Sequence, residues 1–277
     1  AAAAMSVRLC VVGGGRMGSA LVAGLLAGGW GAPGEIAVAE RVAMARELLR
    51  ARFPGLVVVD EPVAAEGLLV AVKPHDAEAV CRQLGGLGYR HVLSIAAGIT
   101  TESLGEWFGG NVAVVRAMPN TPAQIGSGVT VVTGGAGATE ADLVWAEGLL
   151  SAVGTVVRLP EELLDAATGL SGCGPAYLYY LAEALNSAGV AAGLDGAVAR
   201  QLVDQTLYGA ARMILDTGRP ADVLRGEVAS PGGSTEAAIN VLEARQVRAA
   251  FAAAVAAAVA RAGELGGARR APRQRPR

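Results

Sequence analysis

The pattern of apolar and polar positions changes near Pro160 and predicts a different kind of structure on each side. Before it, short β-branched runs alternate with longer amphipathic stretches, which is typical of parallel strands joined by crossover helices. The expected strands are 8–12, 36–40, 57–59, 68–72, 91–95, 112–117, 129–132 and 155–158, and the expected helices are 17–27, 42–52, 75–84, 101–108 and 139–151. Residues 1–160 are therefore predicted to form an α/β domain with a mostly parallel sheet.

From residue 161 the apolar positions follow a helical period. The expected helices are 161–169, 175–192, 197–217, 220–227, 234–244 and 246–264, which predicts an all-α domain over residues 161–265. Residues 184–192 and 249–260 carry no charge on any face, and helices of that kind are usually buried on most sides. Because a small helical domain offers limited depth, we expect these helices to pack against a second copy of the chain in a homodimer.

Residues 266–277 are expected to form a disordered basic tail. They combine five arginines with two prolines, a composition more typical of a solvated end than of a nucleic-acid arm. The net charge of the chain is −2, and no basic face is apparent elsewhere. No nucleic-acid partner is expected.

The cysteine, histidine and apolar content favours a cytoplasmic protein without a metal. No apolar run approaches the roughly 20 residues that span a bilayer, and no export signal is expected before the first glycine loop. Cys10, Cys81 and Cys173 are far apart and lack C-x-x-C spacing, so free thiols in a reducing compartment are expected. His75 and His91 are also far apart in the sequence, and no metal site is expected.

A glycine-rich motif lies between the first expected strand and the first expected helix. It matches G-x-G-x-x-G in the strand–turn–helix context of a Rossmann-type domain. Glycines permit a tight turn and the close approach of backbone N–H groups to a pyrophosphate at the helix N-terminus. We therefore expect dinucleotide binding by Gly13, Gly14, Gly15, Arg16 and Met17.

The end of the second expected strand bears on the choice of dinucleotide. Glu40 lies where an acidic side chain takes the ribose hydroxyls, which favours NADH. Arg41 follows it and could pair with a 2′-phosphate, so NADPH stays open. An exposed Glu–Arg pair at a helix start is the alternative interpretation.

Later strands also end on the side where open α/β sheets bind their ligands. Small residues and prolines at these ends suit rigid loops that line a cleft, although ordinary turns would have the same composition. The expected cofactor contacts here are Ala71, Val72, Lys73, Pro74, Ala97 and Asn120.

Two glycine loops open helices in the second half, at residues 172–175 and 230–235. Backbone N–H groups at a helix start can bind an anion, although a capped helix is the simpler interpretation. No Lys or His occurs from Val92 to Arg277. Reduction of a ketone usually needs such an acid, whereas a cyclic imine can arrive already protonated. Four tyrosines, at 177, 179, 180 and 208, keep the ketone alternative open.

Taken together, these motifs resemble the pyrroline-5-carboxylate reductases over essentially the whole chain to about Leu265. The resemblance rests on the glycine loop and on residues 71–74, 94–98, 116–123, 168–172, 174–177 and 230–235. It implies reduction of pyrroline-5-carboxylate to proline, the last step of proline biosynthesis. It also implies a homodimer, sometimes assembled into decamers, with interlocked C-terminal helices and active sites drawn from both subunits.

The resemblance also implies roles for the second glycine loop. The backbone of Gly232, Gly233, Ser234 and Thr235 would take the substrate carboxylate, and the Thr235 hydroxyl, the expected catalytic group, would address the ring nitrogen. Ser230 and Cys173 would complete the substrate contacts. The family usually has Ser in place of Cys173, and residues 59–66 look short, which leaves Asp60 as the one candidate for the adenine side.

Two other functions stay open on the residues alone. One is a two-domain reductase of the 3-hydroxyacid dehydrogenase type, which would need an acid on its central helix. The other is a dinucleotide sensor without turnover.

Overall fold

The structure is a computed structural model that describes residues 7–110 and 112–267. The chain divides into two compact units. The first comprises the residues up to Cys173 together with those from Ala258 onward, and the second is Gly174–Ala257. Residues 161–173, which the apolar pattern groups with the helices, have most of their contacts in the first unit.

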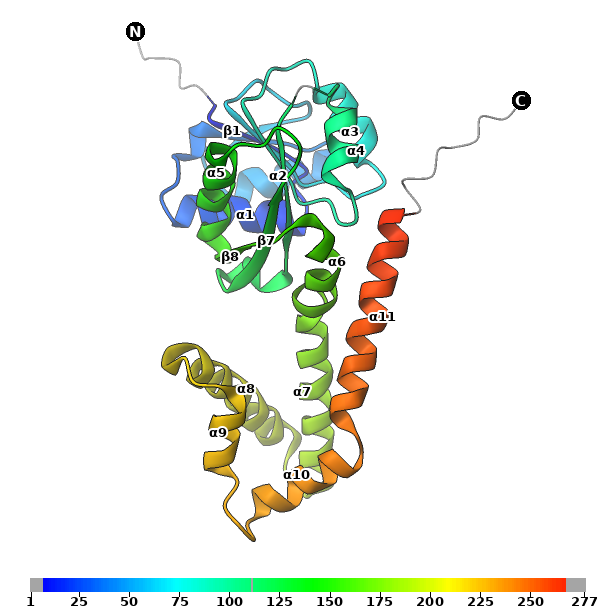
Figure 1. The fold of residues 1–277 in the computed structure, drawn as a ribbon. Helices are drawn as coiled ribbons and strands as arrows, with labels where there is room; N and C mark the ends of the chain where they lie inside the picture. The colour runs from blue at the N-terminus through cyan, green and yellow to red at the C-terminus, as the bar shows by residue number, and fades with distance from the viewer. Residues whose placement is uncertain (1–6, 111, 268–277) are drawn as a thin grey trace, which may run out of the picture. The chain divides into compact units, whose positions relative to one another are not determined.

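The first unit is built on one sheet of eight strands in the order β3-β2-β1-β4-β5-β6-β7-β8. Figure 1 shows this sheet with helices packed around it. Every neighbouring pair is parallel except β6 and β7. The prediction of a parallel-rich α/β domain followed by helices is confirmed. The strands are β1 (Leu9–Val12), β2 (Ile36–Ala39), β3 (Val57–Val59), β4 (Gly67–Val70), β5 (His91–Ser94), β6 (Val114–Pro119), β7 (Gly128–Gly134) and β8 (Gly154–Arg158).

Helices cover both faces of this sheet because successive strand residues point to opposite sides. Leu9 and Val11 of β1 pack in one apolar cluster with α1 (Arg16–Ala27), α2 (Ala43–Arg52) and α5 (Glu140–Leu150). Cys10 and Val12 pack in another with α3 (Ala77–Leu84) and α4 (Thr101–Trp107). Because these strands are buried on both faces, they form the rigid centre of the unit from which the loops that follow them extend.

The segment 161–169 is helical, as predicted, but it is not one regular α-helix. The segment is a 3₁₀ turn (Glu161–Leu163), a short helix α6 (Leu164–Ala167) and a π-helical turn (Thr168–Gly172). The N–H of Cys173 donates to the carbonyl of Thr168 at 2.9 Å. The hydroxyls of Thr168 and Ser171 donate to carbonyls four residues earlier. Such hydroxyls compete for the carbonyls of a regular helix, which explains the irregular winding.

The second unit contains α7 (Gly174–Ala191), α8 (Gly196–Thr217), α9 (Ala221–Val228), α10 (Ser234–Ala244) and the first part of α11 (Val247–Gly267). The Asp195 carboxylate caps α8 by accepting from two backbone N–H groups, and Gly218 ends it with φ of +63°. Helix α11 continues two residues into the predicted tail, and residues 268–277 of that tail lie outside the described residues.

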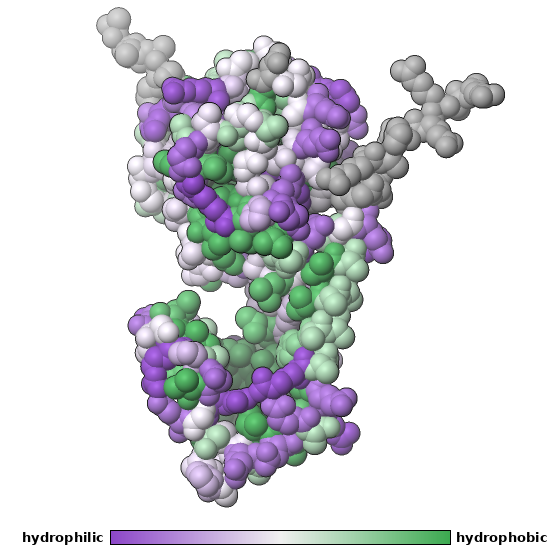
Figure 2. Space-filling model, viewed as in Figure 1, coloured by the Kyte–Doolittle hydropathy of each residue, from purple (hydrophilic) through white to green (hydrophobic). Residues whose placement is uncertain are grey.

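The helices of the second unit bury little by themselves. Among the described residues of Gly174–Ala257, Ala199 alone is fully buried. Apolar patches lie at its surface in Figure 2, and the large apolar side chains exposed there include Leu178, Leu202, Ile214, Leu215, Val241 and Phe251. Exposed apolar surface of this extent marks an interaction face.

No helix over residues 7–110 and 112–267 is long and apolar enough to cross a membrane.

Candidate functional site

A cavity of about 590 Å³ opens in the first unit, at the carboxyl ends of β1, β2 and β4. Strand β1 lies between β2 and β4, so the chain crosses the sheet in both directions from it, and ligands of open α/β sheets bind at such a point. Seven residues expected to bind the cofactor line this cavity, namely Gly13, Gly15, Glu40, Arg41, Ala71, Val72 and Lys73.

The first glycine loop fits a dinucleotide by its geometry. Gly13 has φ of +104°, and a Cβ there would lie 2.6 Å from the carbonyl oxygen of Ala71. A Cβ on Gly18 would lie 2.1 Å from the carbonyl oxygen of Gly13. Gly15 is the N-cap of α1 and supplies no side-chain cap, so the first turn of the helix directs backbone N–H groups outward. A glycine loop and a helix start of this geometry can form a cradle for a pyrophosphate.

Glu40 lies directly beside this loop. One carboxylate oxygen accepts from the N–H of Gly14 at 3.0 Å, and the other accepts from the N–H of Val42 at 2.9 Å. The guanidinium of Arg46 donates to the carbonyl oxygens of Glu40 and Arg41, both at 2.8 Å. These contacts fix the turn after β2, where the adenosine ribose is expected.

The rest of the cavity carries more acidic than basic groups. Asp60 and Glu61 follow β3, and Asp76 follows residues 71–74, in addition to Glu40. Lys73 and Arg41 are the basic residues, with His75 beside them. Sequence reasoning singled out Asp60 but missed Glu61, Pro62, His75 and Asp76. Their position just after the ends of β3 and β4 was the available signal.

The other residues expected to bind cofactor do not line the cavity. Gly14, Arg16, Met17 and Pro74 adjoin its lining residues in the chain, and Ala97 is exposed after β5. The side-chain amide of Asn120 forms two hydrogen bonds within the protein. Its Nδ2 donates to the carbonyl of Ser171 at 3.2 Å, and its Oδ1 accepts from the N–H of Val129 at 3.0 Å. A cofactor contact by Asn120 stays a prediction.

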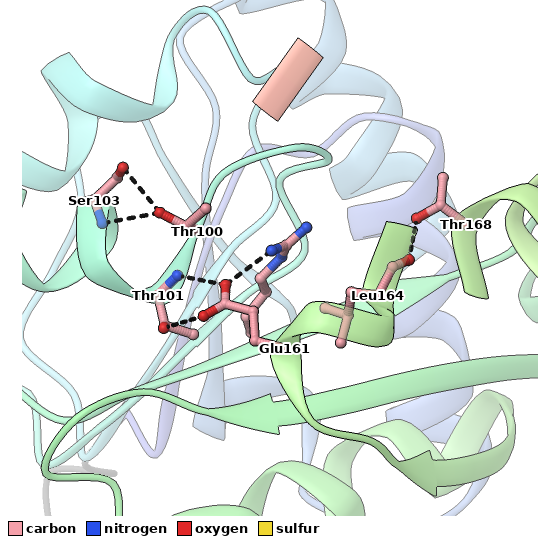
Figure 3. Close-up of polar contacts among 7 residues, drawn as sticks. Thr100, Thr101, Ser103, Glu161, Leu164 and Thr168 are labelled. Carbon is pink, nitrogen blue, oxygen red and sulfur yellow. Dashed lines mark hydrogen bonds and ion pairs between the residues drawn. The ribbon is translucent and has the colours of Figure 1, made fainter. Parts of the chain in front are cut away.

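A buried polar cluster joins β6, the start of α4 and the segment after β8. The Glu161 carboxylate accepts from the backbone N–H and the hydroxyl of Thr101, at 2.8 and 2.6 Å (Figure 3). It also pairs with the Arg116 guanidinium at 2.8 Å, and the Arg116 side chain is only 6% exposed. Burial alone would raise the pKa of Glu161, but the hydrogen bonds from Thr101 and Arg116 outweigh it and hold that pKa below its usual range.

The second glycine loop belongs to the second unit. Gly232 has φ of +74°, and the N–H of Gly233 closes a turn on the carbonyl of Ser230 at 3.0 Å. Gly233 is the N-cap of α10 without a side-chain cap, and Ser234 and the half-buried Thr235 begin the helix. The structure thus brings Ser230, Gly232, Gly233, Ser234 and Thr235 together. Cys173, half-buried, lies in the first unit.

One carboxylate already bonds to this loop. The Glu236 side chain accepts from the N–H of Gly232 at 2.7 Å. The N–H of Gly232, two residues before the start of α10, thus has a carboxylate of the same segment as its partner.

The chain matches known proteins over nearly its full length. Residues 161–265 match the family described as "Pyrroline-5-carboxylate reductase dimerisation", and residues 8–98 match "NADP oxidoreductase coenzyme F420-dependent". A pyrroline-5-carboxylate reductase of a Synechocystis species is 41% identical over 266 residues, which are 95% of this chain and 99% of that protein. The chain belongs to the pyrroline-5-carboxylate reductase family.

Solved structures of pyrroline-5-carboxylate reductases agree with this fold. The enzyme of Coxiella burnetii has a TM-score of 0.88 and 36% identity, and the alignment covers 94% of this chain and 98% of that one. The pyrroline carboxylate reductase of Plasmodium falciparum, solved with NADP bound, has a TM-score of 0.82 and 26% identity, with 95% and 100% covered. The family uses NAD(P)H as its reductant.

Proposed function

We propose that this chain reduces pyrroline-5-carboxylate to proline, with the dinucleotide in the cavity beside Gly13 and the substrate carboxylate on the loop before α10. The observation that carries the proposal is the cradle that Gly13, Gly15 and Ala71 form in the cavity wall, where Gly13 packs so closely on the backbone of Ala71 that a Cβ would not fit. Such a glycine loop at a helix start can accommodate a pyrophosphate. Bound there, a reduced nicotinamide dinucleotide supplies the hydride.

The chain's own groups bind and orient the substrate. Backbone N–H groups at the start of α10 hold the carboxylate of the ring, and the Gly232 N–H already has a carboxylate as its partner. Fixing the ring in this way supplies much of the rate, because the reacting atoms no longer have to find one another.

Thr235 is the proposed catalytic residue. The ring nitrogen has to be cationic, or become protonated, as it gains the electron pair of the former double bond. A threonine hydroxyl is too weak an acid to supply that proton alone. Its proposed role is to hydrogen-bond the ring N–H or to relay a proton from water.

NADH is proposed as the preferred reductant, with NADPH as the second. The Glu40 carboxylate, held beside the loop by Gly14, would accept hydrogen bonds from a ribose diol and repel a 2′-phosphate.

The proposed assembly is a homodimer through the helices of the second unit, with a decamer as a further possible form. The exposed apolar side chains of α7, α8 and α10 support a partner on this unit. The proposed compartment is the cytoplasm, in keeping with the free thiols of Cys10 and Cys81.

Steady-state kinetics on Thr235 variants test the proposal. Thr235→Ala should lower kcat/KM for pyrroline-5-carboxylate by about 10- to 1,000-fold, the range for one lost positioned donor, with dinucleotide affinity nearly unchanged. Thr235→Ser should recover part of the loss because it keeps the hydroxyl. Thr155→Ala, which removes an exposed hydroxyl from β8, is the matched control. Turnover of Thr235→Ala at the wild-type rate would remove the catalytic assignment.

The same nicotinamide absorbance assay separates the alternatives. A 3-hydroxyacid dehydrogenase would reduce NAD with a 3-hydroxyacid and ignore pyrroline-5-carboxylate. A dinucleotide sensor would bind NADH without turnover of either compound.

A further inference from the structure

Two charged side chains and a histidine meet on the wall of the nucleotide cavity. Arg41 comes from the turn after β2, and His75 and Asp76 come from the segment between β4 and α3. One Asp76 oxygen lies 3.7 Å from the Arg41 guanidinium, and the other lies 3.4 Å from Nε2 of His75. The carboxylate therefore has a cationic or polar partner on each side.

Asp76 stands at the N-cap of α3, where an aspartate usually accepts from the backbone of the helix. It makes no such capping hydrogen bond here. Its carboxylate reaches Arg41 across the cavity wall instead. Capping of α3 therefore does not explain the position of the Asp76 side chain.

Arg41 is otherwise free to turn toward a ligand. Its backbone is fixed, because Arg46 holds its carbonyl oxygen at 2.8 Å, while its side chain is 79% exposed. A guanidinium in this position of a Rossmann-type domain can accept the 2′-phosphate of NADPH. The Asp76 carboxylate, 3.7 Å away, offsets part of that positive charge and competes with a phosphate for the guanidinium.

We propose that Asp76 is a specificity-determining residue that withholds Arg41 from a 2′-phosphate and so favours NADH over NADPH. This inference rests on the proposed function, since it requires a dinucleotide in the cavity. Glu40, Asp60 and Glu61 add negative charge to the same walls and act in the same direction.

Dissociation constants for NADH and NADPH, measured by fluorescence titration without substrate, test the inference. Asp76→Asn keeps the shape of the side chain and removes its charge. It should tighten NADPH binding by about five- to tenfold, the scale of one charge next to a phosphate at a surface site, and change NADH binding less than about twofold. Arg41→Ala should abolish the gain when added to Asp76→Asn.

Glu78→Gln is the matched control. It removes the same charge two residues along the chain, where Glu78 pairs with Arg82 and does not line the cavity. An equal gain in NADPH affinity from Glu78→Gln, a gain that survives Arg41→Ala, or an unchanged ratio in Asp76→Asn would each overturn the inference.

The readout also separates this inference from the proposed function. Wild-type protein that binds neither dinucleotide would overturn both. Dinucleotide binding without reduction of pyrroline-5-carboxylate would overturn the proposed reaction alone, and the shift in affinity ratio would still decide the role of Asp76.

Discussion

The ion pair between the half-buried Glu161 and the buried Arg116 allows a quantitative test of what holds the first unit together. Glu161→Gln keeps the shape of the side chain but leaves the Arg116 guanidinium buried without its counter-charge. Breaking a buried pair by removing one partner costs about 3–5 kcal/mol. Glu161 is 28% exposed, so water screens part of the loss, and we expect the unfolding free energy to fall by about 2–3 kcal/mol.

Tryptophan fluorescence during urea unfolding measures this effect in the first unit alone. All three tryptophans, Trp30, Trp107 and Trp145, lie there. A loss of that size should also lower Tm by roughly 4–12 °C in a unit of this length. Glu162→Gln is the control, because Glu162 is the exposed neighbour and carries the same charge. The reasoning is wrong if the two variants unfold within about 0.5 kcal/mol of each other.

The pH dependence of the same difference has a defined sign. The folded protein lowers the pKa of Glu161, so the ionised carboxylate stabilises the fold at every pH above its unfolded pKa of about 4.3. That stabilisation is lost as the pH falls through the lower, folded pKa. The gap between wild type and Glu161→Gln should therefore be constant from neutral pH down to about 5 and should shrink below about 4. A gap that widens in acid would refute the account.

Two further predictions concern the first glycine loop and Cys173. Gly13→Ala should abolish NADH binding in a fluorescence titration, because its Cβ would lie 2.6 Å from the carbonyl oxygen of Ala71. Gly86→Ala is the control and should bind NADH normally, because a Cβ there would meet nothing within 4 Å. Normal NADH binding by Gly13→Ala would contradict the cradle. Iodoacetamide should slow turnover through Cys173, the one cysteine that is not fully buried, with protection by substrate. Equal inactivation of wild type and Cys173→Ser would exclude that role.

Short-range signals in the sequence predicted much of this fold. The helix predicted over 139–151 is α5, and its start is fixed locally, because Thr139 and Asp142 form a capping box within one helical turn. The signal for the glycine loop was equally short-range, because the G-x-G-x-x-G motif lies within six residues. The structure shows why Gly13 has no side chain, since a Cβ there would clash with the carbonyl of Ala71 after β4. Strand and helix bounds agree with the structure to within about two residues over most of the first unit.

Contacts between distant residues could not be predicted in this way. Glu161 bonds to residues 60 and 45 positions earlier, and His91 pairs with Asp142 across 51 positions. In the sequence alone, each of these residues is indistinguishable from an ordinary surface polar residue or a residue that starts a helix. The partners become known only when the fold brings their helices, strands and turns together. The pairing of Asp76 with Arg41 is of the same kind.

Lys73 is the only lysine in the chain, and its exposed amine lies on the wall of the nucleotide cavity. Reagents that acylate amines usually scatter over many surface lysines. The remaining basic side chains here are almost all arginines, whose guanidinium groups stay protonated and do not compete for such reagents at neutral pH. Among side chains, acylation is thus directed to a single position. A fluorophore attached to that amine would report cavity occupancy in the unmutated protein, and a cross-linker attached there would capture whatever molecule enters.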